Sequence, residues 1–178
     1  GEWFSSIVAA CDYKRVGDGD VGPNTGGMGS YSPPVEALWN AEIESRVRRE
    51  IMEPVASALS SKGSPFKGIL YGGLMLTSEG PKVVEFNCRL GDPEAQVVLP
   101  RLKNDLLGVL ISVSQGDAAG ISLEWDGQSR VAVAIASGGY PGKYPTGFTI
   151  EGLDELPHDV SVFHAGTRLE GDAVLTDG

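Results

Sequence analysis

The sequence predicts an α+β protein, in which an antiparallel sheet with helices is followed by a small, mostly β part. Apolar residues recur at helical spacing between residues 36 and 60. Two short apolar runs, 69–77 and 82–87, flank a turn that contains glycine and proline, which indicates a β-hairpin. After Gly120 short strand-like segments alternate with Gly/Pro turns and no helical pattern is evident.

This change of character places a domain boundary near residues 127–129. We therefore expect a first domain over residues 1–128 and the start of a second, β-rich domain over residues 129–178. The sequence begins with Gly1 rather than Met and we expect both domains to be truncated. The first residues carry neither a basic start nor a continuous apolar segment, so they do not resemble a signal peptide.

Composition narrows the class of protein. A hydrophobic content of 41% over 178 residues suits a globular chain. The formal net charge of −10 argues against a nucleic-acid partner, because nothing offsets repulsion from a polyanion. The longest apolar run, 131–136, is far below the ~20 residues that cross a bilayer, so we expect no membrane association. Two cysteines, Cys11 and Cys88, are too few for a disulfide framework, and we expect buried or half-buried thiols in a cytoplasmic protein.

The first element in chain order is a segment rich in glycine and proline, 17–34, which we expect to form a long ordered loop. The helix of residues 36–60 follows, with one apolar row made of Ile43, Val47, Ile51, Val55 and Leu59. Pro54 interrupts this row and should kink the helix near residues 52–53.

The later elements are shorter. We expect the hairpin turn at residues 78–81, and a helix that starts at Pro93 with Asp92 as its N-cap. A second helix is expected over residues 104–114. The expected strands of the last part are 130–137, 149–151, 160–165 and 167–169.

The second strand of the hairpin carries the first candidate site. Glu85 and Asn87 are two residues apart, so both side chains point to one face of a strand, and Arg89 keeps the same parity. Carboxylate and amide oxygens beside a guanidinium suit a site for Mg²⁺ and phosphate. The alternative is purely structural, with Glu85 paired to Arg89 and Asn87 capping a turn.

Two further segments are candidates on weaker grounds. Lys14 and Arg15 are adjacent cations, and the glycines of 22–29 could turn backbone N–H groups toward an anion. This segment lacks the glycine spacing of the common nucleotide-binding loops, so it is also compatible with an ordinary loop. The run 91–94, Gly-Asp-Pro-Glu, is a third candidate, but the residues alone favour a helix start whose acidic residues meet the helix dipole.

Taken together, three strings resemble the phosphoribosylamine–glycine ligase family of ATP-grasp enzymes, also called glycinamide ribonucleotide synthetases. They are 12–20 (DYKRVGDGD), 22–29 (GPNTGGMG) and 85–94 (EFNCRLGDPE). The later pieces 137–142 and 162–167 are similar to the C-terminal domain of that family. The resemblance spans nearly the whole chain but less than half of the family's enzyme.

The resemblance implies the C-terminal half of an ATP-grasp domain, followed by the start of the C-terminal domain. It also implies that an N-terminal domain, the lid over ATP and the hinge that holds adenine lie outside the chain. The implied reaction uses ATP to activate glycine as glycyl phosphate, which the amine of 5-phosphoribosylamine then attacks, in purine biosynthesis. The alternatives are another ATP-grasp carboxylate–amine ligase of purine synthesis, or a piece that is catalytically silent in isolation.

By the same resemblance, Glu85 and Asn87 bind Mg²⁺ or Mn²⁺, and Arg89 steadies the acyl phosphate. Many ATP-grasp enzymes place a second acidic metal ligand at the position that is Gly73 here, so the chain departs from the two-metal pattern. Met75 falls where an apolar side chain often packs on adenine, although it could equally be ordinary core. The implied catalytic cations on the substrate side are Lys14 and Arg15. The implied substrate- and phosphate-binding residues are Asp12, Asn24, Thr25, Gly26, Gly27 and Asp92.

Overall fold

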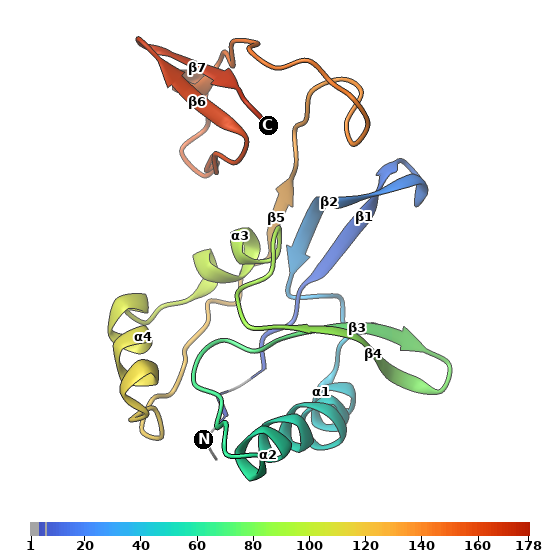
Figure 1. Cartoon of the computed structure of the whole chain (residues 1–178), viewed down its shortest axis with the longest axis vertical. Helices are drawn as coiled ribbons and strands as arrows, with labels where there is room; N and C mark the ends of the chain where they lie inside the picture. Colours follow the sequence, from blue (N-terminus) through green and yellow to red (C-terminus); the bar gives the residue numbers. More distant parts are fainter. Residues whose placement is uncertain (1–3, 6) are drawn as a thin grey trace. The chain divides into compact units, whose positions relative to one another are not determined.

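The computed structural model describes residues 4–5 and 7–178 and divides the chain into two compact units. Unit 1 consists of Gly1–Tyr13 and Gly29–Ala132, and unit 2 of Lys14–Met28 and Val133–Gly178. Figure 1 traces the elements along the chain from the N-terminus to the C-terminus. Helices and antiparallel strands are mixed, which confirms the predicted α+β class.

The predicted long helix of unit 1 begins later than expected and consists of three consecutive segments. They are α1 (Ala41–Val47), the π-helical turn η1 (Arg48–Met52) and α2 (Glu53–Ser61). The Asn40 side chain accepts a hydrogen bond of 3.0 Å from the Ile43 N–H and caps α1. The predicted apolar row is confirmed, since Val47 and Ile51 are buried.

The expected kink takes the form of the π-helical turn. Pro54 has no N–H to donate, and its ring would collide with a carbonyl of the preceding turn. The Glu53 N–H, one residue earlier, bonds to the Arg48 carbonyl five positions back. The wider turn therefore accommodates the proline without ending the helical segment.

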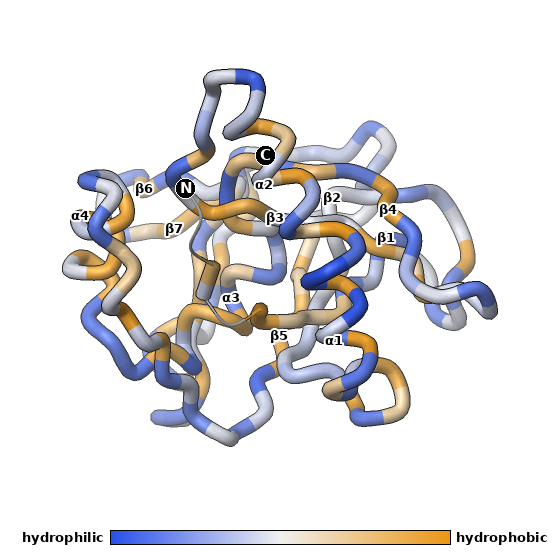
Figure 2. Tube along the Cα trace, turned by 90° about the horizontal axis from the view of Figure 1, so that it is seen from below, coloured by the Kyte–Doolittle hydropathy of each residue, from blue (hydrophilic) through white to orange (hydrophobic). Residues whose placement is uncertain are grey.

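The predicted hairpin is confirmed as β3 (Tyr71–Thr77) paired antiparallel with β4 (Gly80–Asn87). Its register shifts by a bulge between Gly73 and Leu74. Leu74 packs against the buried cluster of Val47, Ile51 and Met52, so helices cover one face of the hairpin. Apolar stretches are visible on both strands in Figure 2.

Short helical segments follow the hairpin: α3 (Ala95–Val98), η2 (Leu99–Arg101) and α4 (Leu106–Gln115). The predicted start at Pro93 with Asp92 as N-cap is wrong, because Glu94 occupies the cap position. Asp92 instead accepts a hydrogen bond of 2.8 Å from the Gln96 amide. The predicted second helix is confirmed as α4, which is capped by Asp105.

A three-stranded sheet has the order β1 (Cys11–Gly17), β2 (Val21–Ser32) and β5 (Arg130–Val133). The long loop predicted for residues 17–34 is therefore wrong, because most of this segment is the middle strand. Pairing on both sides overrides its low β propensity. Gly22 and Gly27 adopt positive φ angles of 85° and 143°, which accommodate the irregular path of the strand.

The last part of unit 2 contains the turn η3 (Leu153–Glu155) and the hairpin of β6 (Thr167–Glu170) with β7 (Ala173–Thr176). The strand predicted for 160–165 is wrong, since Val160 closes a turn by donating to the Pro157 carbonyl. β7 has no counterpart among the predicted strands.

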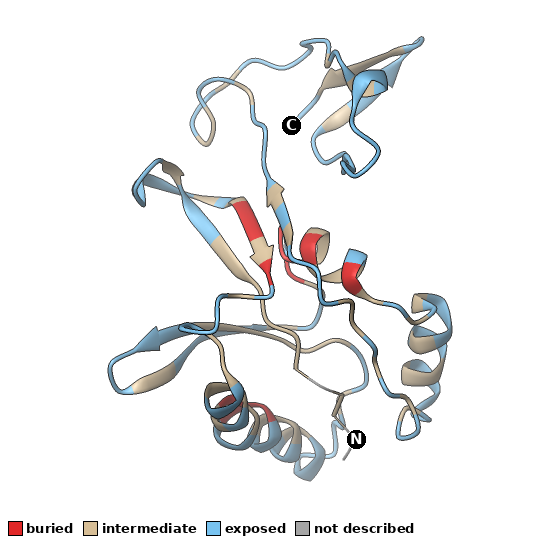
Figure 3. Cartoon of the chain, turned by 180° about the vertical axis from the view of Figure 1, so that it is seen from behind, coloured by how far each residue is buried: buried red, intermediate tan, exposed pale blue. Residues whose placement is uncertain are grey.

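Buried residues of unit 1 gather on the end of β2, around α3 and on the α1–η1 segment (Figure 3). Arg101 is among them and donates a 2.7 Å hydrogen bond to the Ser32 hydroxyl. Cys11 is half-buried as expected, but Cys88, the residue after β4, is exposed, so the expectation of a buried or half-buried thiol is wrong there. Within the described part of the chain, no helix is long and apolar enough to cross a membrane.

The cap of α1 yields a stability prediction. Asn40→Ala removes the acceptor for the Ile43 N–H and should lower the free energy of unfolding by about 1 kcal/mol. Asn40→Ser keeps a capping oxygen and should retain most of the stability. Urea denaturation of the three proteins measures the difference, and equal losses in both variants would contradict the capping role.

Candidate functional site

Glu85 and Asn87 lie side by side near the end of β4. The Asn87 amide donates a 3.0 Å hydrogen bond to Glu85 Oε1, so the two side chains share one face as the alternation predicts. Glu85 is exposed and Asn87 is half-buried. The structural alternative of a Glu85–Arg89 pair is not realised among the described residues, since Arg89 donates a 2.7 Å bond to the Leu90 carbonyl.

The face that carries this pair is the one opposite the helices. Register places Tyr71 opposite Asn87 and Gly73 opposite Glu85, while the neighbouring Leu74 packs on the helical cluster. Met75 lies two residues beyond Gly73, on the same face as Glu85, and 59% of its surface is exposed. An exposed apolar side chain thus accompanies the polar pair.

Gly73 leaves the room that Glu85 occupies. A Cβ built at Gly73 would lie 3.1 Å from Glu85 Cγ, closer than ordinary packing allows. A side chain at this position would require the Glu85 side chain to shift by a few tenths of an ångström.

The donor atoms of the pair fit a magnesium or manganese ion. Glu85 offers carboxylate oxygens and Asn87 an amide oxygen, which are hard ligands, and Glu85 is open to solvent. No group of three or more His, Cys, Asp or Glu in the described ranges could hold a metal. Such a site suits an ion that takes its remaining ligands from water and phosphate rather than from a protein cage.

A second polar pair lies beside the first and was missed by sequence reasoning. The Tyr71 hydroxyl donates a 2.8 Å hydrogen bond to Glu94 Oε1. Glu94 is only 7% exposed, and its loop is held by the Ser30 hydroxyl, which donates a 2.8 Å bond to the Pro93 carbonyl. The signal in the sequence was the Gly-Asp-Pro-Glu run, which identified Asp92 as a ligand candidate although Asp92 is exposed.

Acidic groups surround the Tyr71 hydroxyl. Partial burial raises the pKa of Tyr71 most, and the hydrogen bond and negative charge of Glu94 raise it further. The charges of Asp12 and Glu85 act on this pKa in the same direction. The Tyr71 hydroxyl therefore lies in the field of three carboxylates of unit 1. Their negative charges would favour a nearby cation.

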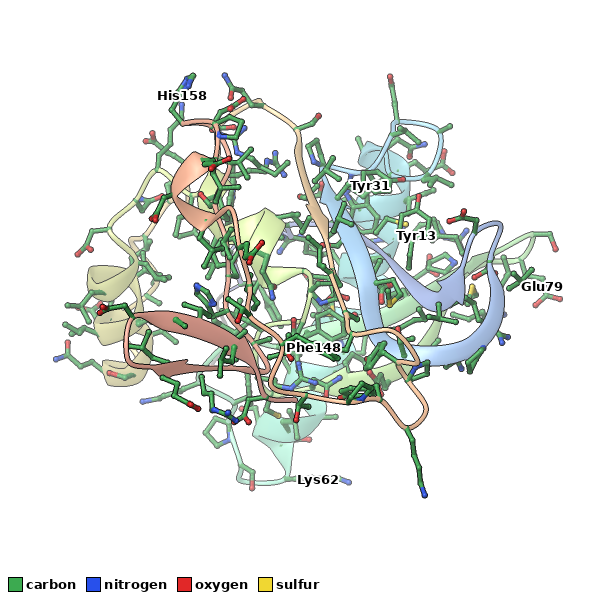
Figure 4. The ribbon with its side chains drawn as sticks, turned by 90° about the horizontal axis from the view of Figure 1, so that it is seen from above. Tyr13, Tyr31, Lys62, Glu79, Phe148 and His158 are labelled. Atoms are coloured by element: carbon green, nitrogen blue, oxygen red, sulfur yellow. The ribbon has the colours of Figure 1, made fainter. Side chains whose placement is uncertain are left out.

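Asp12 lies on β1, close to an aromatic pair. The rings of Tyr13 and Tyr31 have centroids 6.2 Å apart, and Figure 4 labels both side chains. The side chain of Asp12 is half-buried, lines the same cavity as Glu94 and raises the pKa of Cys11, which burial raises more strongly.

The remaining predicted site residues belong to unit 2. The Thr25 hydroxyl donates a 2.9 Å bond to the Lys14 carbonyl. The Lys14 ammonium contacts the Gly26 carbonyl at 3.4 Å, and Arg15 donates a 2.6 Å bond to the Gly22 carbonyl. Asn24 is exposed on β2. The structure thus brings both cations against the glycine-rich strand β2.

Two of the backbone N–H groups expected to face an anion have protein partners. The Gly26 N–H donates to the Tyr140 hydroxyl at 3.2 Å, and the Gly27 N–H donates to the Thr25 hydroxyl at 3.0 Å. In this conformation these two groups bind protein oxygens rather than an anion. The cations, which are exposed, are the groups of this segment that a phosphate could reach.

The raised pKa of Tyr71 predicts a pH effect. An unfolded chain loses its tyrosine protons near pH ~10, whereas folded Tyr71 keeps its proton to higher pH. The free energy of unfolding should therefore fall as the pH rises above ~10, and it should fall less steeply in Tyr71→Phe. Urea denaturation between pH ~9 and ~11 measures the two slopes, and identical slopes would contradict the assignment.

Comparisons with known proteins add the family. Residues 1–95 match the model of the phosphoribosylglycinamide synthetase ATP-grasp (A) domain, and residues 130–178 match the C domain of the same synthetase. The phosphoribosylamine–glycine ligase of Halalkalibacterium halodurans is 51% identical over 178 residues, which is all of this chain and 41% of that protein. The ligase of Salmonella typhimurium is 46% identical over 181 residues, which is all of this chain and 42% of that protein.

The fold agrees with a solved structure. The crystal structure of phosphoribosylamine–glycine ligase from Thermotoga maritima superimposes with a TM-score of 0.80 at 32% identity, over 95% of this chain and 41% of that one. The chain thus spans about two fifths of the length of the relatives it matches. On these matches and on the hairpin that carries Glu85 and Asn87, the chain belongs to the phosphoribosylglycinamide synthetase family.

Proposed function

We propose that this chain supplies part of an ATP-dependent ligase that joins glycine to 5-phosphoribosylamine, giving glycinamide ribonucleotide for purine synthesis in the cytoplasm. Its relatives are named phosphoribosylamine–glycine ligase, and that name supports the substrates and the bond formed. The chain spans about two fifths of those relatives, so the activity requires parts that lie outside it.

The geometry of the β3–β4 hairpin is the observation that carries this proposal. Glu85 and Asn87 share the face that the helices leave uncovered, and Met75 is exposed on the same face. Hard oxygen ligands beside an exposed apolar side chain suit a metal-bound nucleotide, with phosphates toward the carboxylate and the base toward the methionine.

In the proposed reaction, a carboxylate oxygen of glycine attacks the γ-phosphate of ATP, and ADP leaves. The amine of phosphoribosylamine then attacks the carbonyl carbon of glycyl phosphate, loses a proton and displaces inorganic phosphate. A bound Mg²⁺ or Mn²⁺ ion supplies neutralisation of phosphate charge, and Glu85 and Asn87 are its ligands in our proposal. Arg89, which is exposed, keeps guanidinium donors for the acyl phosphate beyond its bond to Leu90.

We assign the remaining candidate residues to the binding of substrate and of its phosphate. The exposed cations Lys14 and Arg15 are catalytic groups that meet substrate phosphate. The substrate- and phosphate-binding residues are Asp12, Asn24, Thr25, Gly26, Gly27 and Asp92. We also propose a first domain over residues 1–128 and a second domain that begins at residue 129. The separate matches of residues 1–95 and 130–178 to two domains of the family support these limits.

Mn²⁺ binding tests the metal ligand. We expect Glu85→Gln to weaken binding of Mn²⁺ with a non-hydrolysable ATP analogue at least about tenfold, because it removes the charged ligand while keeping the side-chain size. Electron paramagnetic resonance of free Mn²⁺ measures the affinity.

Glu79→Gln is the matched control. Glu79 lies in the turn of the same hairpin, exposed and paired to Lys82 at 2.9 Å, so its loss should leave the Mn²⁺ affinity unchanged. Equal Mn²⁺ affinities for the wild-type chain and Glu85→Gln would sink the metal assignment.

A further inference from the structure

Tyr140 connects the C-terminal segment of unit 2 to the glycine-rich strand β2. Its hydroxyl accepts a 3.2 Å hydrogen bond from the Gly26 N–H, 114 residues away in the sequence. Both residues belong to unit 2, and Gly26 is exposed while Tyr140 is half-buried. A side chain from a distant part of the sequence thus holds the segment that we propose to bind substrate phosphate.

A tight turn presents the Tyr140 hydroxyl to β2. The Tyr140 N–H donates a 3.1 Å bond to the Ser137 carbonyl. Gly139 has a φ of 104°, and a Cβ there would lie 2.8 Å from the Lys143 carbonyl oxygen, so the turn requires glycine at this position. The Tyr140 ring packs edge-on against the ring of Tyr144, with centroids 5.7 Å apart. The fold therefore places the phenol ring before any ligand binds.

Gly26 is held at both of its backbone polar atoms. Its N–H is bound by Tyr140, and its carbonyl oxygen accepts a hydrogen bond of 3.4 Å from the Lys14 ammonium. The neighbouring Thr25 hydroxyl donates to the Lys14 carbonyl at 2.9 Å and accepts from the Gly27 N–H at 3.0 Å. A short series of hydrogen bonds therefore runs from the Tyr140 hydroxyl through Gly26 to the Lys14 ammonium.

This series bears on phosphate binding because lysine is flexible. Its ammonium lies at the end of a long stem, and fixing that stem when a ligand binds costs rotamer entropy. The Gly26 carbonyl restricts the Lys14 ammonium in advance, which reduces this cost as long as Gly26 itself stays in place. Gly26 is exposed and has no side chain to anchor it, so its position depends on backbone bonds such as the one to Tyr140.

We propose that Tyr140 is a positioning residue, which holds Gly26 so that the Lys14 ammonium meets the phosphate of the sugar phosphate substrate. This inference rests on the proposed function, in which Lys14 meets substrate phosphate. The Lys14 ammonium contacts the anion, and Tyr140 acts through Gly26 without touching the substrate. Loss of the Tyr140 hydroxyl therefore weakens phosphate binding only while Lys14 is present.

Titration of the isotope-labelled full chain with ribose 5-phosphate, followed by NMR, tests this role. We expect saturable binding of ribose 5-phosphate to the wild-type chain and no binding of ribose, because the phosphate supplies the contact. Tyr140→Phe removes the hydroxyl but keeps the ring, and should weaken binding at least about threefold, within the range of one hydrogen bond. Without ligand, the same variant should speed hydrogen exchange of the Gly26 amide, since this exposed N–H loses its acceptor.

Tyr144→Phe is the matched control. Tyr144 is half-buried in the same segment and packs on the Tyr140 ring, and its hydroxyl makes no hydrogen bond to the described residues of β2. This variant should leave both the affinity for ribose 5-phosphate and the exchange of the Gly26 amide unchanged. Thermal unfolding of each variant verifies that it is folded.

A second substitution separates positioning from a merely structural role. Lys14→Met removes the charge and should weaken binding at least about tenfold, with Arg15 left to hold the phosphate. If Tyr140 acts through Lys14, Tyr140→Phe should not weaken binding further in the Lys14→Met background. A structural role would instead lower the affinity by the same factor in both backgrounds.

The outcomes distinguish this inference from the function on which it rests. Unchanged affinity in Tyr140→Phe, or equal losses in both backgrounds, would overturn the positioning role alone. No saturable binding to the wild-type chain, or binding that Lys14→Met leaves intact, would contradict the phosphate role of Lys14 and this inference with it. Because the probe contains neither metal nor nucleotide, the result is separate from the Mn²⁺ test at Glu85.

Discussion

The packing of one hairpin face against a helix determines where the polar groups of unit 1 lie. Leu74 contacts the cluster of Val47, Ile51 and Met52, and this contact fixes which side of β3 is buried. Because side chains alternate along a strand, the opposite side must then carry Met75, and β4 must present Glu85 and Asn87 there. A one-residue slip of the register would turn this polar pair toward the helices.

The same hairpin connects the two polar pairs. Tyr71 lies opposite Asn87 in the register, and its hydroxyl reaches across to Glu94 in the loop before α3. The Tyr71 hydroxyl thus joins Glu94 to β3, the strand paired with the one that carries the metal ligand candidates. The negative charges of Glu94, Asp12 and Glu85 all raise the pKa of Tyr71, so its hydroxyl lies in the field of three carboxylates.

Local patterns predicted the elements whose stability is local. The apolar row of the first helix, the hairpin around its glycine turn and the shared face of Glu85 and Asn87 all follow from residue spacing. The β2 strand could not be predicted, because its glycine-rich backbone is held by partners far away in the sequence. The burial of Glu94 could not be predicted for a similar reason. It depends on Tyr71, 23 residues earlier, and on the absence of a side chain at Gly91.

The discontinuity of unit 2 has a consequence for how the chain is made. The segment Lys14–Met28 packs with Val133–Gly178, and the Gly26 N–H bonds to the Tyr140 hydroxyl, 114 residues later. During synthesis at the ribosome, the early segment emerges long before its partner exists. Closing so large a loop is entropically slow, so this half should complete its folding last, after the helices and the β3–β4 hairpin have formed.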